Sequence, residues 1–204
     1  MHIDHCIMRP LRVFILAAFL LAVSVNSAWG AKDLGVSPSE LHSRLSALIE
    51  ERGFSSDIGY DIVLGAPQAR EKVNGVSSGS LRVCDKVFLL YYCSPGTDVI
   101  AEINLLTSLS ASVMEEYGSE SSVEIVILSI LIADALGDLF AGEGYPKLSD
   151  ALIKCGESLV ERVQAGEADI EESDYLRMED REFLIMHKYS RHLWTMLFSI
   201  TAIQ

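Results

Sequence analysis

The clearest pattern of apolar and polar positions follows Ser37. Ser37 and Glu40 have the spacing of a capping box, and Pro38 occupies the first helical position, where its missing N–H is tolerated. Leucine and isoleucine side chains then recur at helical spacing until Gly53, a residue typical of helix ends. This pattern predicts a helix between Ser37 and Gly53.

Two further segments have the same kind of punctuation. Ser121 and Glu124 repeat the capping-box spacing, and residues 122–140 are apolar around their middle turns, which is typical of a helix in the centre of a bundle. Another helix is expected over residues 146–165, where a proline opens an apolar stripe that stops before Gly166.

Helical spacing also favours helices over residues 97–117 and 173–202. Residues 81–93 can be a helix or a buried strand, and we expect a helix. Glycines break residues 54–80 into an irregular segment, and an acidic connector occupies residues 166–174. The expected fold is therefore a single-domain all-α helical bundle of about six to seven helices.

The N-terminus has the features of an export signal. Basic residues precede an apolar run at 13–25, which is short for a membrane span, and Ala28 and Gly30 supply the small residues of a cleavage site. We expect residues 1–30 to be a signal peptide and residues 31–204 to form one exported domain, in the periplasm of a Gram-negative bacterium or secreted. The alternative is an uncleaved signal that anchors the chain.

The chain is acidic, with a formal net charge of −13 at pH 7. Because nucleic-acid binding depends on Lys and Arg that neutralise phosphates, we expect no nucleic-acid partner. The apolar residues 183–203 leave a peripheral membrane contact open. Half of all residues are apolar, so the body of the chain should fold rather than stay disordered.

Removal of the signal peptide takes Cys6 away and leaves Cys84, Cys93 and Cys155, an odd number in an oxidising compartment. On one helix, Cys84 and Cys93 would lie on opposite faces and too far apart to bond. Any disulfide should therefore join Cys155 to Cys84 or Cys93. The alternative is that all three thiols are buried as small apolar side chains.

One segment matches a catalytic motif. Ser77 is central in a Gly-Val-Ser-Ser-Gly stretch that fits G-x-S-x-G, the pattern that presents a nucleophilic serine on a strand-to-helix turn. The residues before it are polar and favour a helix, so the required context is missing. His187 and His192 do not form the i, i+4 pair of a helical metal site. We expect no enzyme, no metal and no cofactor.

Glu102 lies on the apolar side of the helix expected over residues 97–117. A carboxylate there has to pair, take up a proton or lie at a rim, so Glu102 is a candidate buried polar site with either a functional or a structural role. In the last predicted helix, Ile185, Trp194 and Phe198 point away from the main apolar stripe. Such positions favour an interface with a partner, unless neighbouring helices cover them.

These observations leave three functions open. The expected one is a non-catalytic exported protein that acts through protein–protein contacts, as an accessory or assembly factor of an envelope machine such as a secretion system. Its partner would be another envelope or secreted protein. The second is a helical binder of a small or lipid-like ligand, with Glu102 as its polar group. The third is a serine hydrolase that uses Ser77. No oligomeric state is predicted.

Overall fold

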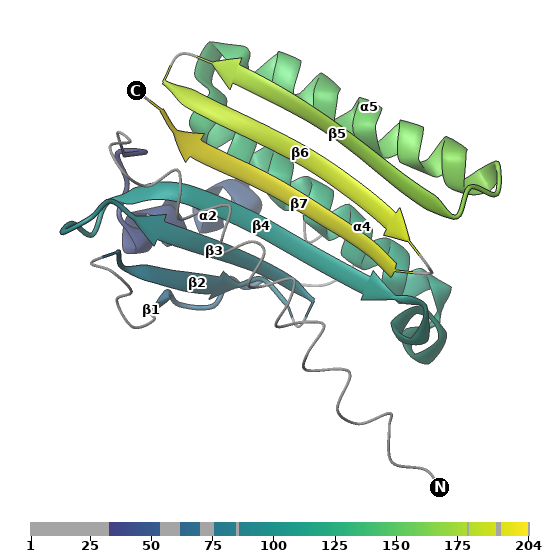
Figure 1. The fold of residues 1–204 in the computed structure, drawn as a ribbon. Coiled ribbons are helices and arrows are strands. Elements are labelled where there is room, and N and C mark those ends of the chain that lie inside the picture. Colours follow the sequence, from purple (N-terminus) through teal and green to yellow (C-terminus); the bar gives the residue numbers. More distant parts are fainter. Residues whose placement is uncertain are drawn as a thin grey trace, which may run out of the picture.

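Within the residues that the structure describes, an antiparallel sheet of seven strands is the largest feature (Figure 1). The computed structural model describes residues 33–53, 62–69, 76–84, 86–178, 180–190 and 193–203. The expected all-α bundle is therefore wrong, and the predicted signal peptide lies outside the described residues. In spatial order, the strands are β1 (Gln68–Ala69), β2 (Ser78–Arg82), β3 (Val87–Cys93), β4 (Ile100–Ser110), β7 (Leu193–Ala202), β6 (Arg181–Ser190) and β5 (Asp169–Met178).

Helices pack on one face of this sheet (Figure 1). Helix α4 contacts β4 and β7, α5 contacts β5 and β6, and α2 packs against α4. A short 3-10 turn, η1, joins α4 to α5, so these two helices form a hairpin across the sheet. The helical elements are α2 (Pro38–Arg52), α4 (Ala111–Ala141), η1 (Gly142–Gly144) and α5 (Tyr145–Gln164).

The helices that carry their own start and stop signals are confirmed. The Ser37 hydroxyl accepts a hydrogen bond from the backbone N–H of Glu40 at 3.3 Å, and Gly53 ends α2 in the left-handed region, with φ of 68°. Helix α5 matches the helix predicted over residues 146–165. The helix predicted over residues 122–140 lies inside α4, which begins earlier in the chain.

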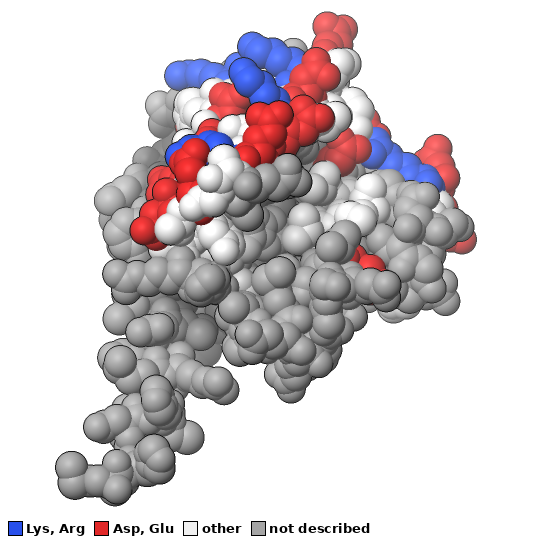
Figure 2. Space-filling model, turned by 90° about the vertical axis from the view of Figure 1, so that its right-hand side faces the viewer, with Lys and Arg blue, Asp and Glu red and all other residues white. Residues whose placement is uncertain are grey.

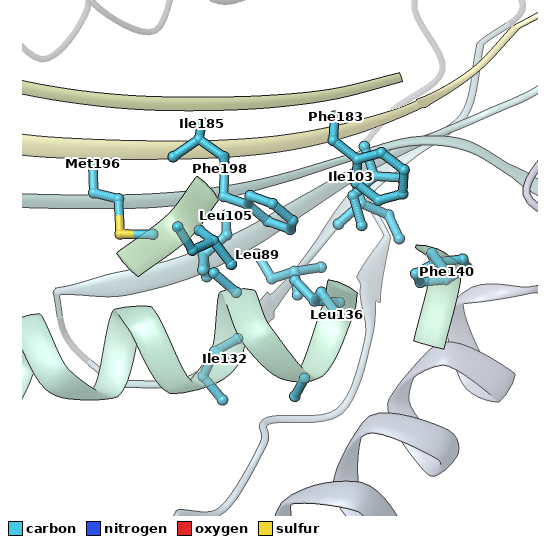
Figure 3. Packing of buried hydrophobic residues seen from close by; sticks show 14 of the residues in the cluster. Leu89, Ile103, Leu105, Ile132, Leu136, Phe140, Phe183, Ile185, Met196 and Phe198 are labelled. Carbon is cyan, nitrogen blue, oxygen red and sulfur yellow. The ribbon is translucent and has the colours of Figure 1, made fainter. Parts of the chain in front are cut away.

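Cross-strand pairing builds the core between the sheet and α4. It aligns apolar residues of β4, β7 and β6 in rows: Ile103, Ile200 and Phe183 in one, and Leu105, Phe198 and Ile185 in the next. Figure 3 shows five of these side chains, Ile103, Phe183, Leu105, Phe198 and Ile185, together with Ile132, Leu136 and Phe140 of α4. Each large apolar side chain contributes about 1.5–3 kcal/mol when it is fully buried, so these rows hold α4 firmly on the sheet.

The helix predicted over residues 97–117 is wrong, because Ile100–Ser110 form strand β4 and α4 begins directly afterwards. The pleat of a strand sends successive side chains to opposite faces. Leu105 therefore faces the helices, whereas Glu102 points to the other face of the sheet. Helical spacing had placed Glu102 on the same face as Leu109, which in the strand faces the helices instead.

The long helix predicted over residues 173–202 is also wrong, since this region forms most of β5 and all of β6 and β7. Strand β7 is buried on both faces along most of its length, so its sequence does not alternate between apolar and polar residues. Strands β5 and β6 pair as far as Met178 and Arg181, and β6 and β7 pair as far as Ser190 and Leu193. The two-residue connections, 179–180 and 191–192, contain neither the glycine nor the asparagine that signals a hairpin. The acidic connector expected at residues 166–174 is mostly the start of β5.

Two further expectations change in the first half of the chain. Residues 81–93, expected to be a helix, form the end of β2 and the whole of β3. Of the irregular segment expected over residues 54–80, the described part includes β1 and the beginning of β2. The apolar run of β3 is the buried strand that the sequence left as the alternative.

One helical stretch of the described chain, Glu124–Leu159, is long and apolar enough to cross a membrane by length and composition. Half of its most apolar window is buried inside the protein. The apolar character of this stretch is thus largely used in packing against the sheet and the neighbouring helices.

Candidate ligand-binding groove

A groove of about 550 Å³ lies between α4, α5 and the strands β6 and β7. Its walls are mainly apolar. Val126 and Ile130 come from α4, and Leu152, Ile153 and Leu159 come from α5. Leu152 and Leu159 are buried, whereas Ile153 is 54% exposed, so Ile153 lies where the groove opens to solvent. The volume and the lining are typical of sites for small apolar ligands.

Two glycines show where α4 and α5 are in close contact and where they leave space for the groove. Near the η1 turn, a Cβ atom on Gly137 of α4 would lie 2.8 Å from Leu148 Cδ2 of α5, so the helices are in close contact there. A Cβ atom on Gly156, further along α5, would meet nothing within 4 Å. Glycine inside a helix costs roughly 0.5–1 kcal/mol relative to alanine. At Gly156 no steric need offsets that cost, and the missing side chain widens the groove.

His187 of β6 lies at the floor of the groove. It follows the core residues Phe183 and Ile185 at every second position of β6, so the pleat turns it toward the helices as well, and it is only 1% exposed. Neither Nδ1 nor Nε2 of His187 has a hydrogen-bond partner. The indole of Trp194 lies beside it, with 5.9 Å between ring centroids. Burial lowers the pKa of His187 to about 4, so the imidazole is neutral at neutral pH.

The isolation of His187 contrasts with the buried hydroxyls nearby. Met196 of β7 is the cross-strand neighbour of His187 on one side and of Thr107 of β4 on the other. The Thr107 hydroxyl forms a hydrogen bond of 2.7 Å with the Ser129 hydroxyl. Ser129 also donates to the carbonyl of Ile125 at 2.7 Å. A neutral imidazole offers one donor and one acceptor, and a buried polar group without a partner costs about 1–3 kcal/mol. The floor of the groove therefore contains a polar group, the His187 imidazole, whose hydrogen bonds are not satisfied.

Carboxylates surround the groove. Glu157 and Glu161 of α5 line it and are exposed, and Glu172 of β5 pairs across the strands with His187. The guanidinium group of Arg162 forms ion pairs with Glu172 and Glu167. The distance from Arg162 Nη2 to Glu167 Oε2 is 2.6 Å. These contacts lower the pKa of Glu172, with the Arg162 hydrogen bond as the largest cause. Figure 2 shows carboxylate groups, with Lys and Arg side chains among them, over the part of the molecule where β5 and α5 lie.

A second polar cluster joins three helices. Arg52, in the last turn of α2, donates to Asp134 of α4 at 2.6 Å and pairs with Asp138. Tyr145 and Ser149 of α5 donate to the same Asp134 carboxylate, at 2.6 and 3.1 Å. Burial and the Asp134 hydrogen bond raise the pKa of Tyr145. Since every group of this cluster has a partner, we interpret it as a structural clasp between α2, α4 and α5.

The structure places Glu102 and Ser77 away from the groove. Glu102 is 7% exposed on the opposite face of the sheet, where it accepts a hydrogen bond from the Asn104 amide at 2.7 Å. Ser77 directly precedes β2, and its carbonyl accepts from the backbone N–H of Cys93 at 2.8 Å. Strand β2 follows Ser77 where a nucleophile elbow needs a helix, so the local geometry gives no support to a nucleophilic role.

The expected interface residues lie in the core. Ile185 and Phe198 are completely buried between the sheet and α4, and Trp194 is 8% exposed at the floor of the groove. They do not form a surface on which a partner could dock. The candidate residue that sequence reasoning missed is His187, because the spacing of His187 and His192 was judged only for a metal site. Once β6 is recognised as a strand, the signal that finds His187 is its place two residues after Ile185 and four after Phe183, on the same buried face.

The cysteines Cys84, Cys93 and Cys155 are free thiols in the described structure. Cys93 is buried on β3, whereas Cys155 on α5 is close enough to Asp174 of β5 for that carboxylate to raise its pKa, after the larger effect of burial. Strands β4, β7 and β6 separate β3 from β5, at about 4.8 Å per strand. Cys93 and Cys155 are therefore beyond the reach of a disulfide.

Among the described residues, no group of three or more His, Cys, Asp or Glu side chains is arranged to hold a metal ion. The groove is the described pocket that has a buried polar group without a hydrogen-bond partner, His187, in its lining. No protein-family model, no curated protein and no solved structure matches this chain.

Proposed function

We propose that this protein is a non-catalytic binder of a small apolar ligand, which occupies the groove between α4, α5 and the sheet. The observation that carries this proposal is His187, a buried and neutral imidazole without a hydrogen-bond partner at the floor of an apolar groove of about 550 Å³. A ligand that fills the groove would bury its apolar surface and satisfy this imidazole at the same time.

The site differs from the helical pocket expected from the sequence. Its floor is a sheet, and its polar group is His187 instead of Glu102. Action through protein–protein contacts stays a prediction. Part of its support was the apolar surface expected at the C-terminal end of the chain, and Trp194 and Phe198 of that region are buried. Burial of these anchors makes ligand binding the better-supported function.

We retain export as part of the proposal, with residues 1–30 as the signal peptide. A binder in the periplasm or outside the cell would take up its ligand from the envelope or the medium. Cell fractionation followed by N-terminal sequencing tests this part. Recovery of a chain that begins near Ala31 supports export, and an intact N-terminus in the cytosol contradicts it.

Trp194 provides a direct assay of ligand binding. The chain contains two tryptophans, Trp29 and Trp194. Trp29 lies in the proposed signal peptide, so Trp194 is the single tryptophan of the cleaved chain, and Trp29→Phe makes it the single tryptophan of the full chain. Trp194 lies at the floor of the groove. N-phenyl-1-naphthylamine, an uncharged apolar fluorophore, should bind there and receive energy from Trp194. Saturable energy transfer is the expected result.

Gly156→Leu supplies the blocking variant, because its side chain would extend into the open space of the groove. We expect this substitution to abolish saturable energy transfer without lowering the melting temperature. Lys154→Leu is the matched control, since it adds the same side chain to an exposed position of α5 that does not line the groove. Absence of fluorophore binding, or binding that Gly156→Leu leaves unchanged, contradicts the proposal.

A further inference from the structure

We infer that the ligand is an uncharged apolar alcohol whose hydroxyl group reaches His187, while its apolar body lies along the walls formed by α4 and α5. This inference rests on the proposed function, because it names the chemical class that the same groove selects. It is carried by the unpartnered ring nitrogens at the floor and by the charges around the groove.

The chemistry of His187 selects the polar group. A neutral imidazole carries a proton on one ring nitrogen and a lone pair on the other. Both ring nitrogens are buried in the ligand-free protein. A hydroxyl group both donates and accepts, so it can bond to either nitrogen once the ligand displaces the side chains that cover it. Such a bond would satisfy the buried imidazole of His187, which has no partner in the ligand-free protein. This gain would make an otherwise apolar site specific for ligands with a hydroxyl group.

The surrounding charges disfavour a carboxylate. A carboxylate only accepts hydrogen bonds, and it would enter a groove that already has the carboxylates of Glu157 and Glu161 in its lining. No Lys or Arg lines the described groove, and Arg162 is already paired with Glu167 and Glu172. A fatty acid would therefore have to bury its charge without a counter-ion.

An ammonium group is disfavoured at the floor for a related reason. It only donates hydrogen bonds, and burial of a charged group without an opposite charge is costly. The exposed carboxylates of Glu157 and Glu161 can attract a cation to the mouth of the groove, but that position leaves His187 without a partner. Only an uncharged polar group can form a hydrogen bond with His187 without bringing a charge into the apolar groove.

Three ligands of equal chain length test this inference: decanol, decanoate and decylamine. Each is titrated against N-phenyl-1-naphthylamine bound to the full chain with Trp29→Phe. We expect decanol to displace the fluorophore at a concentration lower by on the order of tenfold than decanoate or decylamine, as one hydrogen bond to a buried group predicts. Equal or better displacement by decanoate or decylamine overturns the inference, although fluorophore binding would still support the proposed function.

Two variants separate the contributions of the floor and the mouth. His187→Phe should remove most of the advantage of decanol, because phenylalanine keeps the ring and loses both nitrogens. The double variant Glu157→Gln and Glu161→Gln should improve decanoate binding and leave decanol unchanged. Decanol binding that His187→Phe does not weaken overturns the inference. If the fluorophore does not bind the unsubstituted groove at all, the proposed function itself fails.

Discussion

The rings of His187 and Trp194 lie 5.9 Å apart between centroids, tilted by 34°, at the floor of the groove. The two residues come from neighbouring strands, and both are buried. Trp194 covers one side of the imidazole with an apolar surface, and the ring nitrogens of His187 have no partner. Burial in this arrangement keeps the imidazole neutral at neutral pH, and its hydrogen-bonding capacity is not used within the protein.

Replacement of His187 should stabilise the ligand-free protein. His187→Phe removes two unsatisfied buried nitrogens and packs an apolar ring beside Trp194, so the free energy of unfolding should rise by about 1–2 kcal/mol. Urea denaturation of both proteins measures the difference. Thr107→Val is the control, because it removes a buried hydroxyl that does have a partner and should destabilise by about 1 kcal/mol. A less stable His187→Phe variant would mean that the imidazole has a structural role.

Stability should fall at acidic pH because of the same residue. The pKa of His187 is lowered to about 4 in the folded state from an ordinary value of 6.5, so the unfolded chain binds the proton more tightly. The contribution of neutral His187 to the free energy of unfolding is complete above pH 6.5. About 3 kcal/mol of this free energy is lost in total as the pH falls toward 4. The charged groups that α5 and β5 bring to this region are Glu157, Glu161 and Glu172, the last of which is paired with Arg162 of α5, whereas α4 and β7 present apolar side chains.

The difference between wild type and His187→Phe isolates this effect, because the other titrating groups are shared by both proteins. Wild type should lose about 3 kcal/mol more than the variant when denaturation is measured at pH 7 and at pH 4. Parallel pH profiles for the two proteins would show that the histidine is not desolvated.

The clasp around Asp134 should contribute substantially to stability. Arg52→Leu leaves the Asp134 carboxylate with the Tyr145 and Ser149 donors but without its counter-charge, so we expect a loss of about 1–3 kcal/mol. Arg44→Leu is the matched control in the same helix. Arg44 forms an exposed pair with Glu40 at 3.8 Å, and its removal should change stability by less than about 0.5 kcal/mol. Equal effects of the two substitutions would contradict the role of the clasp.

Alanine at two glycines should have opposite effects. A Cβ atom on Gly79 of β2 would lie 2.1 Å from the Tyr91 hydroxyl and 2.5 Å from the carbonyl oxygen of Gln68, so Gly79→Ala should cost several kcal/mol, on the order of an overpacked core. Gly156→Ala meets open space in a helix and should stabilise by roughly 0.5–1 kcal/mol. Thermal denaturation of both variants measures the contrast, and a destabilised Gly156→Ala would show that the groove is narrower there than the structure has it.

Local signals in the sequence determined two of the helices. Helix α2 has a cap at Ser37 and a left-handed terminator at Gly53, and both interactions form within a few residues. Helix α5 has an apolar stripe whose period matches one buried face, and Gly166 follows it with φ of 82°. Such elements can be predicted because the groups that begin, end and bury them are close together in the chain.

Tertiary structure decided the sheet and the groove. Strand β7 has both faces buried, so its apolar residues fit a buried helix as well as a strand, and only pairing with β4 and β6 selects the strand. The groove depends on the separation of α4 and α5 near Gly156, which no local pattern encodes. The sequence by itself determined that His187 is present, but its lack of a partner follows from the packing of three distant elements around it.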